Sequence, residues 1–164
     1  MKLAPIALFT YNRPSHTRCT VEALKTNALA RESDLYLFSD APKNEAACRG
    51  VAEVRRYLKT VDGFKSVTVI EREKNFGLAK SIINGVTSLV NEFGKIIVME
   101  DDLVTSPHFL KFMNDALERY AEDEKVMQIS GYVLPIELKL SVTSFFAPLT
   151  SSWDWATWQR AWKK

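Results

Sequence analysis

The chain has 164 residues, the size of one ordinary domain and enough to bury a hydrophobic core. Its net charge of +2, without basic runs or interleaved basic and aromatic residues, argues against nucleic-acid binding. No apolar stretch reaches the ~20 residues of a membrane span, and the first residues lack a signal-peptide pattern. Cys19 and Cys48 have no metal-type spacing and are expected to be reduced thiols. We therefore expect a cytoplasmic protein, with a peripheral position beside a membrane left open.

Strand and helix signals alternate along the chain. Short apolar runs predict strands, and amphipathic stretches predict helices between them. The predicted strands cover residues 5–10, 34–39, 66–71, 96–99, 126–130 and 144–147. The predicted helices cover residues 15–27, 44–59, 78–93 and 106–120, with Ser15 as a first N-cap and Gly94 as a C-cap. This alternation is typical of a single α/β domain with a mainly parallel sheet.

Three acids, Glu100, Asp101 and Asp102, directly follow the buried strand at 96–99. Burying unpaired carboxylates is costly, so the chain must leave the core here. Open parallel sheets bind ligands at the carboxyl ends of their strands. Adjacent carboxylates repel unless a cation satisfies them, and Mn²⁺ or Mg²⁺ prefers oxygen ligands. The acid triplet therefore indicates a metal site, and a solvated turn that caps the next helix is the alternative.

The segments after the other parallel strands are expected at the same edge of the sheet. They contain Tyr11, Asn12 and Arg13, then Asp40, then the polar loop 72–77. Arg13 is a candidate for contacting a phosphate or a base, and Asp40 for accepting a hydrogen bond from a base or ribose. The alternatives are a solvated arginine and a turn-forming aspartate. The sequence has no glycine-rich phosphate loop, which argues against dinucleotide enzymes and P-loop NTPases.

The end of the chain holds all four tryptophans, at positions 153, 155, 158 and 162. The spacing of Trp155, Trp158 and Trp162 predicts one face of a helix. Such a helix either seals the core or forms an aromatic wall against which the apolar face of a sugar packs.

In their order, these motifs resemble the nucleotide-sugar-dependent glycosyltransferases of the GT-A fold, and among them bacterial relatives of the N-acetylglucosaminyltransferase I type and family-2-like enzymes. The resemblance rests on residues 6–14 (IALFTYNRP), 37–40 (LFSD), 72–78 (REKNFGL), 98–103 (VMEDDL) and 151–162 (SSWDWATWQRAW). The acid triplet corresponds to the DXD metal motif of this family. The resemblance implies a Rossmann-like three-layer fold, with a mainly parallel central sheet and helices on both faces.

By this resemblance, Asp102 would ligate the metal, Mn²⁺ or Mg²⁺. Glu100 would contact the ribose and Asp101 the donor sugar. Arg13 would touch the base or the phosphates, and Asp40 would bind the base, which we expect to be uracil.

The resemblance also implies a donor side and an acceptor side of one cleft. The remaining expected donor-site residues are Tyr11, Arg72 and Asn75. Trp153 and Trp155 lie in the segment that forms the acceptor side in related enzymes. Bacterial relatives often read Ser-Trp-Gly-Trp there, so Asp154 departs from the pattern, either as a local variation or as an acid that serves the site.

The implied activity is metal-dependent transfer of a sugar from a nucleotide donor, expected to be a UDP-sugar, to a glycan or other hydroxyl acceptor in polysaccharide assembly. Related domains continue past the tryptophan segment, where inverting members hold their catalytic base. We therefore expect residues 1–164 to be one domain truncated on its acceptor side, with the base beyond Lys164 or at Asp154. Two alternatives remain: a non-catalytic nucleotide-sugar-binding fragment, and a sugar nucleotidyltransferase, although that class usually has a glycine-rich loop after the first strand.

Overall fold

The computed structural model describes residues 2–133 and 144–164, which form a six-stranded sheet in the order β3-β2-β1-β4-β6-β5. The strands are β1 (Ile6–Thr10), β2 (Asp34–Ser39), β3 (Ser66–Glu71), β4 (Lys95–Glu100), β5 (Ile129–Ser130) and β6 (Trp155–Trp158). The first four strands along this order are mutually parallel, and β6 pairs antiparallel with both β4 and β5. The mainly parallel sheet expected from the sequence is confirmed.

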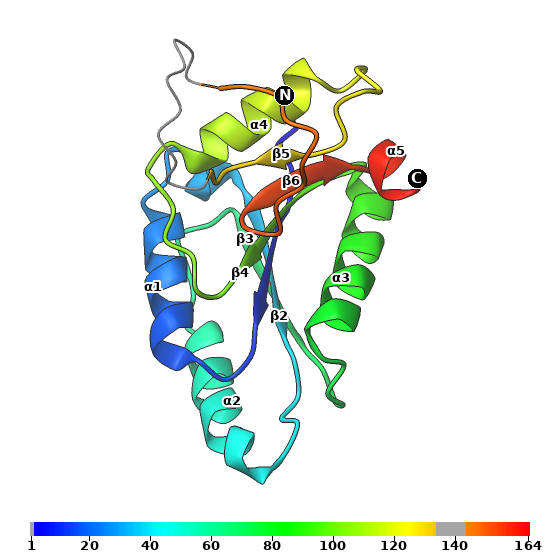
Figure 1. The fold of residues 1–164 in the computed structure, drawn as a ribbon. Helices are drawn as coiled ribbons and strands as arrows, with labels where there is room; N and C mark the ends of the chain where they lie inside the picture. Colours follow the sequence, from blue (N-terminus) through cyan, green and yellow to red (C-terminus); the bar gives the residue numbers. More distant parts are fainter. Residues whose placement is uncertain (1, 134–143) are drawn as a thin grey trace.

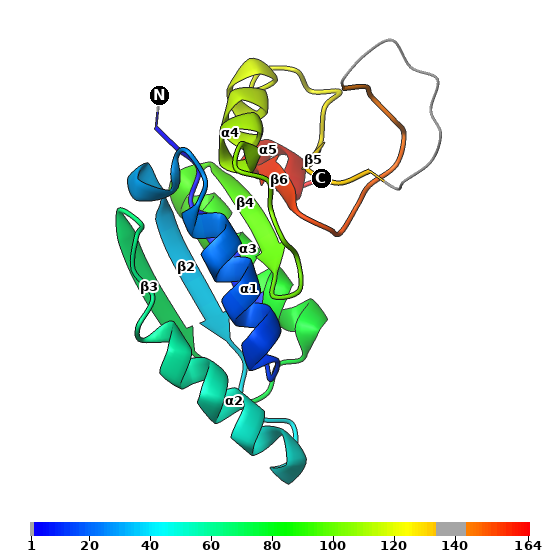
Figure 2. The ribbon, with the colours of Figure 1, turned by 90° about the vertical axis from the view of Figure 1, so that its left-hand side faces the viewer.

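Helices cover both faces of this sheet. They are α1 (Pro14–Lys25), α2 (Glu45–Leu58), α3 (Leu78–Phe93), α4 (Phe109–Arg119) and α5 (Gln159–Trp162), with a 3-10 turn at η1 (Ala30–Glu32). α1, α2 and α4 lie on one face, and α3 and α5 lie on the other (Figure 1). Figure 2 looks onto the face with α1 and α2. The three-layer α/β fold is therefore confirmed. Within the described residues, no helix combines the length and hydrophobicity needed to cross a bilayer.

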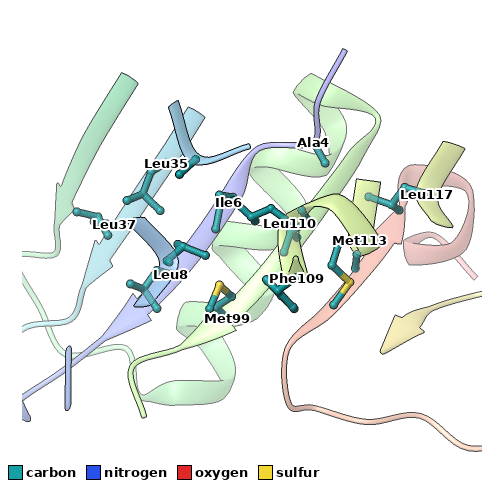
Figure 3. Close-up of a cluster of buried hydrophobic side chains, with 14 of the residues drawn as sticks. Ala4, Ile6, Leu8, Leu35, Leu37, Met99, Phe109, Leu110, Met113 and Leu117 are labelled. Atoms are coloured by element: carbon teal, nitrogen blue, oxygen red, sulfur yellow. The ribbon is translucent and has the colours of Figure 1, made fainter. Parts of the chain in front are cut away.

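The core has two halves, because successive residues of a strand point to opposite faces. On β1, Ile6 and Leu8 pack with Leu110 and other residues of the face that carries α1 and α4 (Figure 3). Ala7 and Phe9 pack toward α3 on the other face. A strand buried on both faces reads as a continuous apolar run, which is why β1 could be recognised from the sequence.

α3 approaches the sheet closely, and Gly85 makes this possible. A Cβ at Gly85 would lie 2.7 Å from Cζ of Phe9, whose ring stacks on Phe38 with centroids 4.8 Å apart. α3 ends at Gly94 in the left-handed conformation, with φ of 79°, so the predicted C-cap is confirmed.

Several predicted boundaries were wrong. α1 begins at Pro14, so Ser15 lies inside the helix and is not its N-cap. α4 begins at Phe109, later than predicted. The strand predicted at 126–130 is reduced to Ile129–Ser130, and residues 144–147 form no strand.

The helix predicted for the tryptophan segment was also wrong. Residues Trp155–Trp158 form β6, and only the last turn is helical. Trp155 and Trp158 therefore point to opposite faces. Trp155 stacks on Trp162 beside α3, whereas Trp158 donates from Nε1 to the carbonyl of Leu117 at 3.0 Å, on the α4 side. The unpaired edge of β4 accounts for the difference, because its backbone groups need hydrogen-bond partners that a strand supplies.

Candidate functional site

An open pocket of about 340 Å³ lies at the carboxyl ends of the parallel strands, the lower end of the sheet in Figure 1. Its walls come from the end of β1 and the turn after it, the segment after β2, the first turn of α3 and the end of β4. The sequence-predicted residues in these walls are Tyr11, Arg13, Asp40, Asn75, Glu100 and Asp101. The topology of the sheet brings them together from segments far apart in the chain.

Asp101 is the buried support of one wall, and only 2% of it is exposed. One carboxylate oxygen accepts from the N–H of Tyr11 at 3.3 Å and from the hydroxyl of Thr17 at 3.2 Å. The other accepts from the guanidinium of Arg13. These donors all come from the turn after β1 and the start of α1, so Asp101 fixes that turn against the end of β4. The expected contact of Asp101 with a donor sugar remains a prediction.

Asp102, next along the chain, is more exposed. Nη1 of Arg13 donates to Oδ2 of Asp102 at 2.9 Å, and the two side chains are 42% and 39% exposed. Asp102 lines a second, smaller pocket of about 150 Å³ beside α1. Burial alone would lower the pKa of Arg13, but the nearby carboxylates Asp101 and Asp102 outweigh it and raise that pKa.

Glu100 completes the acid triplet. Burial raises the pKa of the Glu100 carboxyl, and the charges of Asp102 and Asp101 raise it further, against the opposing effect of Arg13. A raised carboxyl pKa means that negative charge is disfavoured at this position. Three adjacent carboxylates are accompanied here by the single guanidinium of Arg13, which pairs with Asp101 and Asp102.

Asp40 shapes the opposite wall and is 6% exposed. Its Oδ1 accepts from the N–H of Ala41 and of Phe76, and its Oδ2 accepts from the N–H of Gly77, each at 2.9 Å. Asn75 closes the same loop, donating from Nδ2 to the carbonyl of Ala41 at 2.6 Å. Both side chains thus hold the start of α3 against the end of β2. Whether Asp40 also contacts a base remains a prediction.

The first turn of α3 lines the pocket with Gly77, Leu78 and Ser81, none of which the sequence analysis singled out. Gly77 is the N-cap residue, and it supplies no side chain to cap the first N–H groups. The Asp40 carboxylate accepts from the N–H of Gly77, and the positive end of the helix dipole favours a further anion beside the N–H groups that follow. Lys43 also lines the pocket. Its place three residues after Asp40 was the signal that could have identified it, because the whole segment after a parallel strand reaches the same edge.

Arg72 and Trp155 line neither of the two pockets. The guanidinium of Arg72 lies 4.5 Å from the ring centroid of Phe76, in the loop outside the pocket walls. Trp155 packs on Trp162 beside α3. Both contacts stabilise the fold, and the donor and acceptor contacts expected of Arg72 and Trp155 remain predictions without support from this arrangement.

Trp153 is 46% exposed and meets Tyr132 edge-on, with ring centroids 4.7 Å apart. β6 pairs Val98 of β4 with Trp155, so Trp153 and Asp154 continue alongside the end of β4. Tyr132 was missed, because nothing in the local sequence indicates that the pairing of β6 would bring it to Trp153.

Asp154 is the most unusual residue near the acid triplet. It has a positive φ of 44°, is 8% exposed, and its Oδ1 has no hydrogen-bond partner among the described residues. Burial, and then the charges of Asp102 and Glu100, raise the pKa of Asp154 to about 7. A glycine would suit the left-handed backbone at this position, which few other residues adopt readily.

The residues present fit a hard divalent cation. Within the described part of the chain, no three carboxylate, histidine or cysteine side chains lie close enough to hold an ion alone. Mn²⁺ and Mg²⁺ do not require such a cluster, because they commonly bind through one or two carboxylates and the phosphates of a substrate. The buried Oδ1 of Asp154 has no hydrogen-bond partner among the described residues, so it is an oxygen that a cation could use.

No protein-family model matches the chain, and no curated protein matches it. Solved structures do match the chain, and two of them are described here. The mannosyltransferase PcManGT from Pyrobaculum calidifontis, in complex with GDP-Man and Mn²⁺, matches with a TM-score of 0.53 and 13% identity over 78% of this chain and 35% of its own. S. aureus TarS matches with a TM-score of 0.51 and 13% identity over 71% of this chain and 20% of its own.

The chain thus spans about a third of the mannosyltransferase and a fifth of TarS. At this identity the likeness shows the fold alone. The fold is the Rossmann-like α/β fold of the GT-A type that the sequence led us to expect, and it is shared with a glycosyltransferase. The finer resemblance to the N-acetylglucosaminyltransferase I type remains an expectation.

Proposed function

We propose that this chain is the nucleotide-sugar-binding part of a glycosyltransferase, which transfers a sugar from a UDP-linked donor to a hydroxyl acceptor with the help of Mn²⁺ or Mg²⁺. The observation that carries the proposal is the pocket at the carboxyl edge of the sheet, where Glu100 and Asp101 of the acid triplet, Arg13 and the start of α3 meet. The mannosyltransferase with the same fold was solved with GDP-Man and Mn²⁺, which supports this class of ligand.

Each part of the donor has a chemically suitable group in the walls of the pocket or beside it. Arg13 and the first N–H groups of α3 offer hydrogen-bond donors to a diphosphate. Glu100 offers a carboxylate to the ribose hydroxyls. Asp102 would hold the metal, and Tyr11 would pack beside the base. A bound divalent cation would neutralise the charge that builds on the nucleoside diphosphate as it leaves.

The acceptor side is proposed to lie at Trp153 and Tyr132. An exposed aromatic ring provides a flat apolar surface, and the apolar face of a sugar packs on such a surface. The two rings are in contact, so each holds the other in place. This arrangement favours a glycan acceptor over a small alcohol.

The proposal is tested by calorimetric titration of UDP, with Mn²⁺ and then with a chelator. We expect UDP to bind in the presence of Mn²⁺ and to bind much more weakly after chelation, because the cation would link the carboxylate to the diphosphate. GDP, titrated in parallel, should bind more weakly if uracil is the base. Asp102→Ala should abolish the metal-dependent part of the affinity.

The matched control is Asp115→Ala, which removes an exposed carboxylate on α4 that pairs only with Lys111 among the described residues. Unchanged affinity of Asp102→Ala for UDP in Mn²⁺ would contradict the metal assignment. Tighter binding of GDP than of UDP would contradict the uracil assignment. Release of UDP from a UDP-sugar, measured separately, distinguishes a transferase from a non-catalytic binding fragment.

A further inference from the structure

The carboxylate of Asp154 has no role in the proposed function so far, and two features make it costly to keep. Asp154 is only 8% exposed, and its Oδ1 has no hydrogen-bond partner within the described residues. Its backbone has a φ of 44°, in the left-handed region. A buried unpaired carboxylate and a left-handed non-glycine residue are both unfavourable. A ligand that uses the carboxylate would explain why the position tolerates both.

The strand pairing brings Asp154 close to the acid triplet. β6 runs antiparallel to β4 with Trp155 opposite Val98, so Asp154 lies one step further toward the carboxyl end of β4, where the triplet begins. The charges of Asp102 and Glu100 both act on the Asp154 carboxyl. Asp102 and Asp154 therefore lie near one another, the first just after β4 and the second just before β6.

The backbone of Asp154 is held in this position. Its carbonyl accepts from the N–H of Gly131 at 2.8 Å, across the pairing of β5 and β6. The residue is therefore placed by two strands and not by a free loop. A carboxylate fixed in this way is suited to a ligand that needs a defined geometry.

We infer that Asp154 is a second carboxylate ligand, together with Asp102, of the divalent cation. This inference rests on the proposed function. A hard cation would satisfy the unpartnered Oδ1 and relieve the repulsion among the three acids. Two carboxylates and a diphosphate complete the usual donor set of Mn²⁺ or Mg²⁺. The metal site would then join β4 to β6, on the boundary between the donor pocket and the exposed pair Trp153 and Tyr132.

The test is a titration of the protein with Mn²⁺, with and without UDP. The electron paramagnetic resonance signal of the free ion measures how much Mn²⁺ is bound. Asp154→Asn keeps the size of the side chain, and Asp154→Gly removes it at a backbone conformation that glycine adopts freely. We expect both variants to lose roughly tenfold or more of the Mn²⁺ affinity. Asp115→Asn, an exposed carboxylate on α4, should leave it unchanged.

A circular dichroism spectrum and a thermal unfolding midpoint show whether each variant is folded. With two variants, a folding defect in one of them does not prevent the test. Mn²⁺ affinity within about twofold of the wild type in both variants would overturn the inference. If Asp102→Ala alone loses Mn²⁺, the inference fails and the proposed function stands. If the wild-type chain binds neither Mn²⁺ nor UDP, the proposed function fails with it.

Discussion

The guanidinium of Arg13 donates a 2.9 Å hydrogen bond to Asp102, the acid to which we assign the metal. The chain thus supplies a cation of its own to the acid triplet. A guanidinium and a divalent ion compete for the same carboxylate oxygens. Arg13 must therefore share or release Asp102 when the metal binds, and its fork of N–H donors then becomes available for phosphate oxygens.

Replacing Arg13 by Gln should separate these two effects. We expect Arg13→Gln to bind Mn²⁺ alone more tightly than the wild type, because Asp102 loses its competing cation. The same variant should bind UDP with Mn²⁺ about tenfold more weakly, because a charged donor to the diphosphate is lost. Calorimetry measures both affinities. Arg13→Lys, which keeps the charge without the fork, is the control, and a weaker affinity of Arg13→Gln for Mn²⁺ would show that Arg13 does not compete with the metal.

The neighbouring acids Asp101 and Asp102 should contribute differently to the stability of the fold. Asp101→Asn leaves the Arg13 guanidinium, the N–H of Tyr11 and the hydroxyl of Thr17 with one carbonyl oxygen between them. We expect the free energy of unfolding to fall by about 2–3 kcal/mol, because hydrogen bonds to a buried charged group are lost. Asp102→Asn, at a partly exposed position, should cost under about 1 kcal/mol. Urea denaturation measures both, and equal losses would contradict the supporting role of Asp101.

Removing the Asp40 carboxylate should loosen the wall formed by the start of α3. Asp40→Ala leaves the N–H groups of Ala41, Phe76 and Gly77 without their acceptor, and we expect a loss of about 1–3 kcal/mol in unfolding free energy. Binding of uridine and of diphosphate should weaken together, because the loop serves both. Separate titrations of the two ligands decide the question. A clearly larger loss for uridine would show that Asp40 also binds the base.

The pKa of Asp154 predicts a pH dependence of stability. The pKa of Asp154 rises from 3.8 to about 7 on folding. At a pH between these two values, the folded protein therefore retains a proton that the unfolded chain has lost. The contribution of Asp154 to the free energy of unfolding is fully present below about pH 4 and is lost as the pH rises through about 7. The loss is at most about 4 kcal/mol.

Asp154→Asn has no such titration, and the other groups are common to both proteins. The unfolding free energy of the wild type, minus that of Asp154→Asn, should therefore fall between pH 4 and pH 8. Urea denaturation at a series of pH values, in the presence of a chelator, provides the measurement. A constant difference across this range would contradict the raised pKa. Saturating Mn²⁺ should restore the wild type at high pH if the cation binds Asp154.

Local signals accounted for much of the fold. The strands β1 and β4 are buried on both faces, so their continuous apolar runs identified them, and the bounds of α3 follow from its amphipathic pattern and from Gly94. The convergence of Arg13, Asp40 and Glu100 followed from a general rule about parallel sheets. The supports of the pocket could not be foreseen, because the partner of Asp101 or Asp40 depends on which backbone N–H groups packing brings nearby.

The parallel α/β architecture and the position of the acid triplet could be predicted from local patterns, because burial and periodicity are properties of neighbouring residues. The strand at Trp155–Trp158 depends on its pairing with the edge of β4, which is far away in the chain. Its tryptophan spacing alone suits a helix equally well. That pairing also brought Asp154 beside Glu100 and Asp102. Contacts between residues remote in the chain are set by the packing of whole elements, which no local pattern encodes.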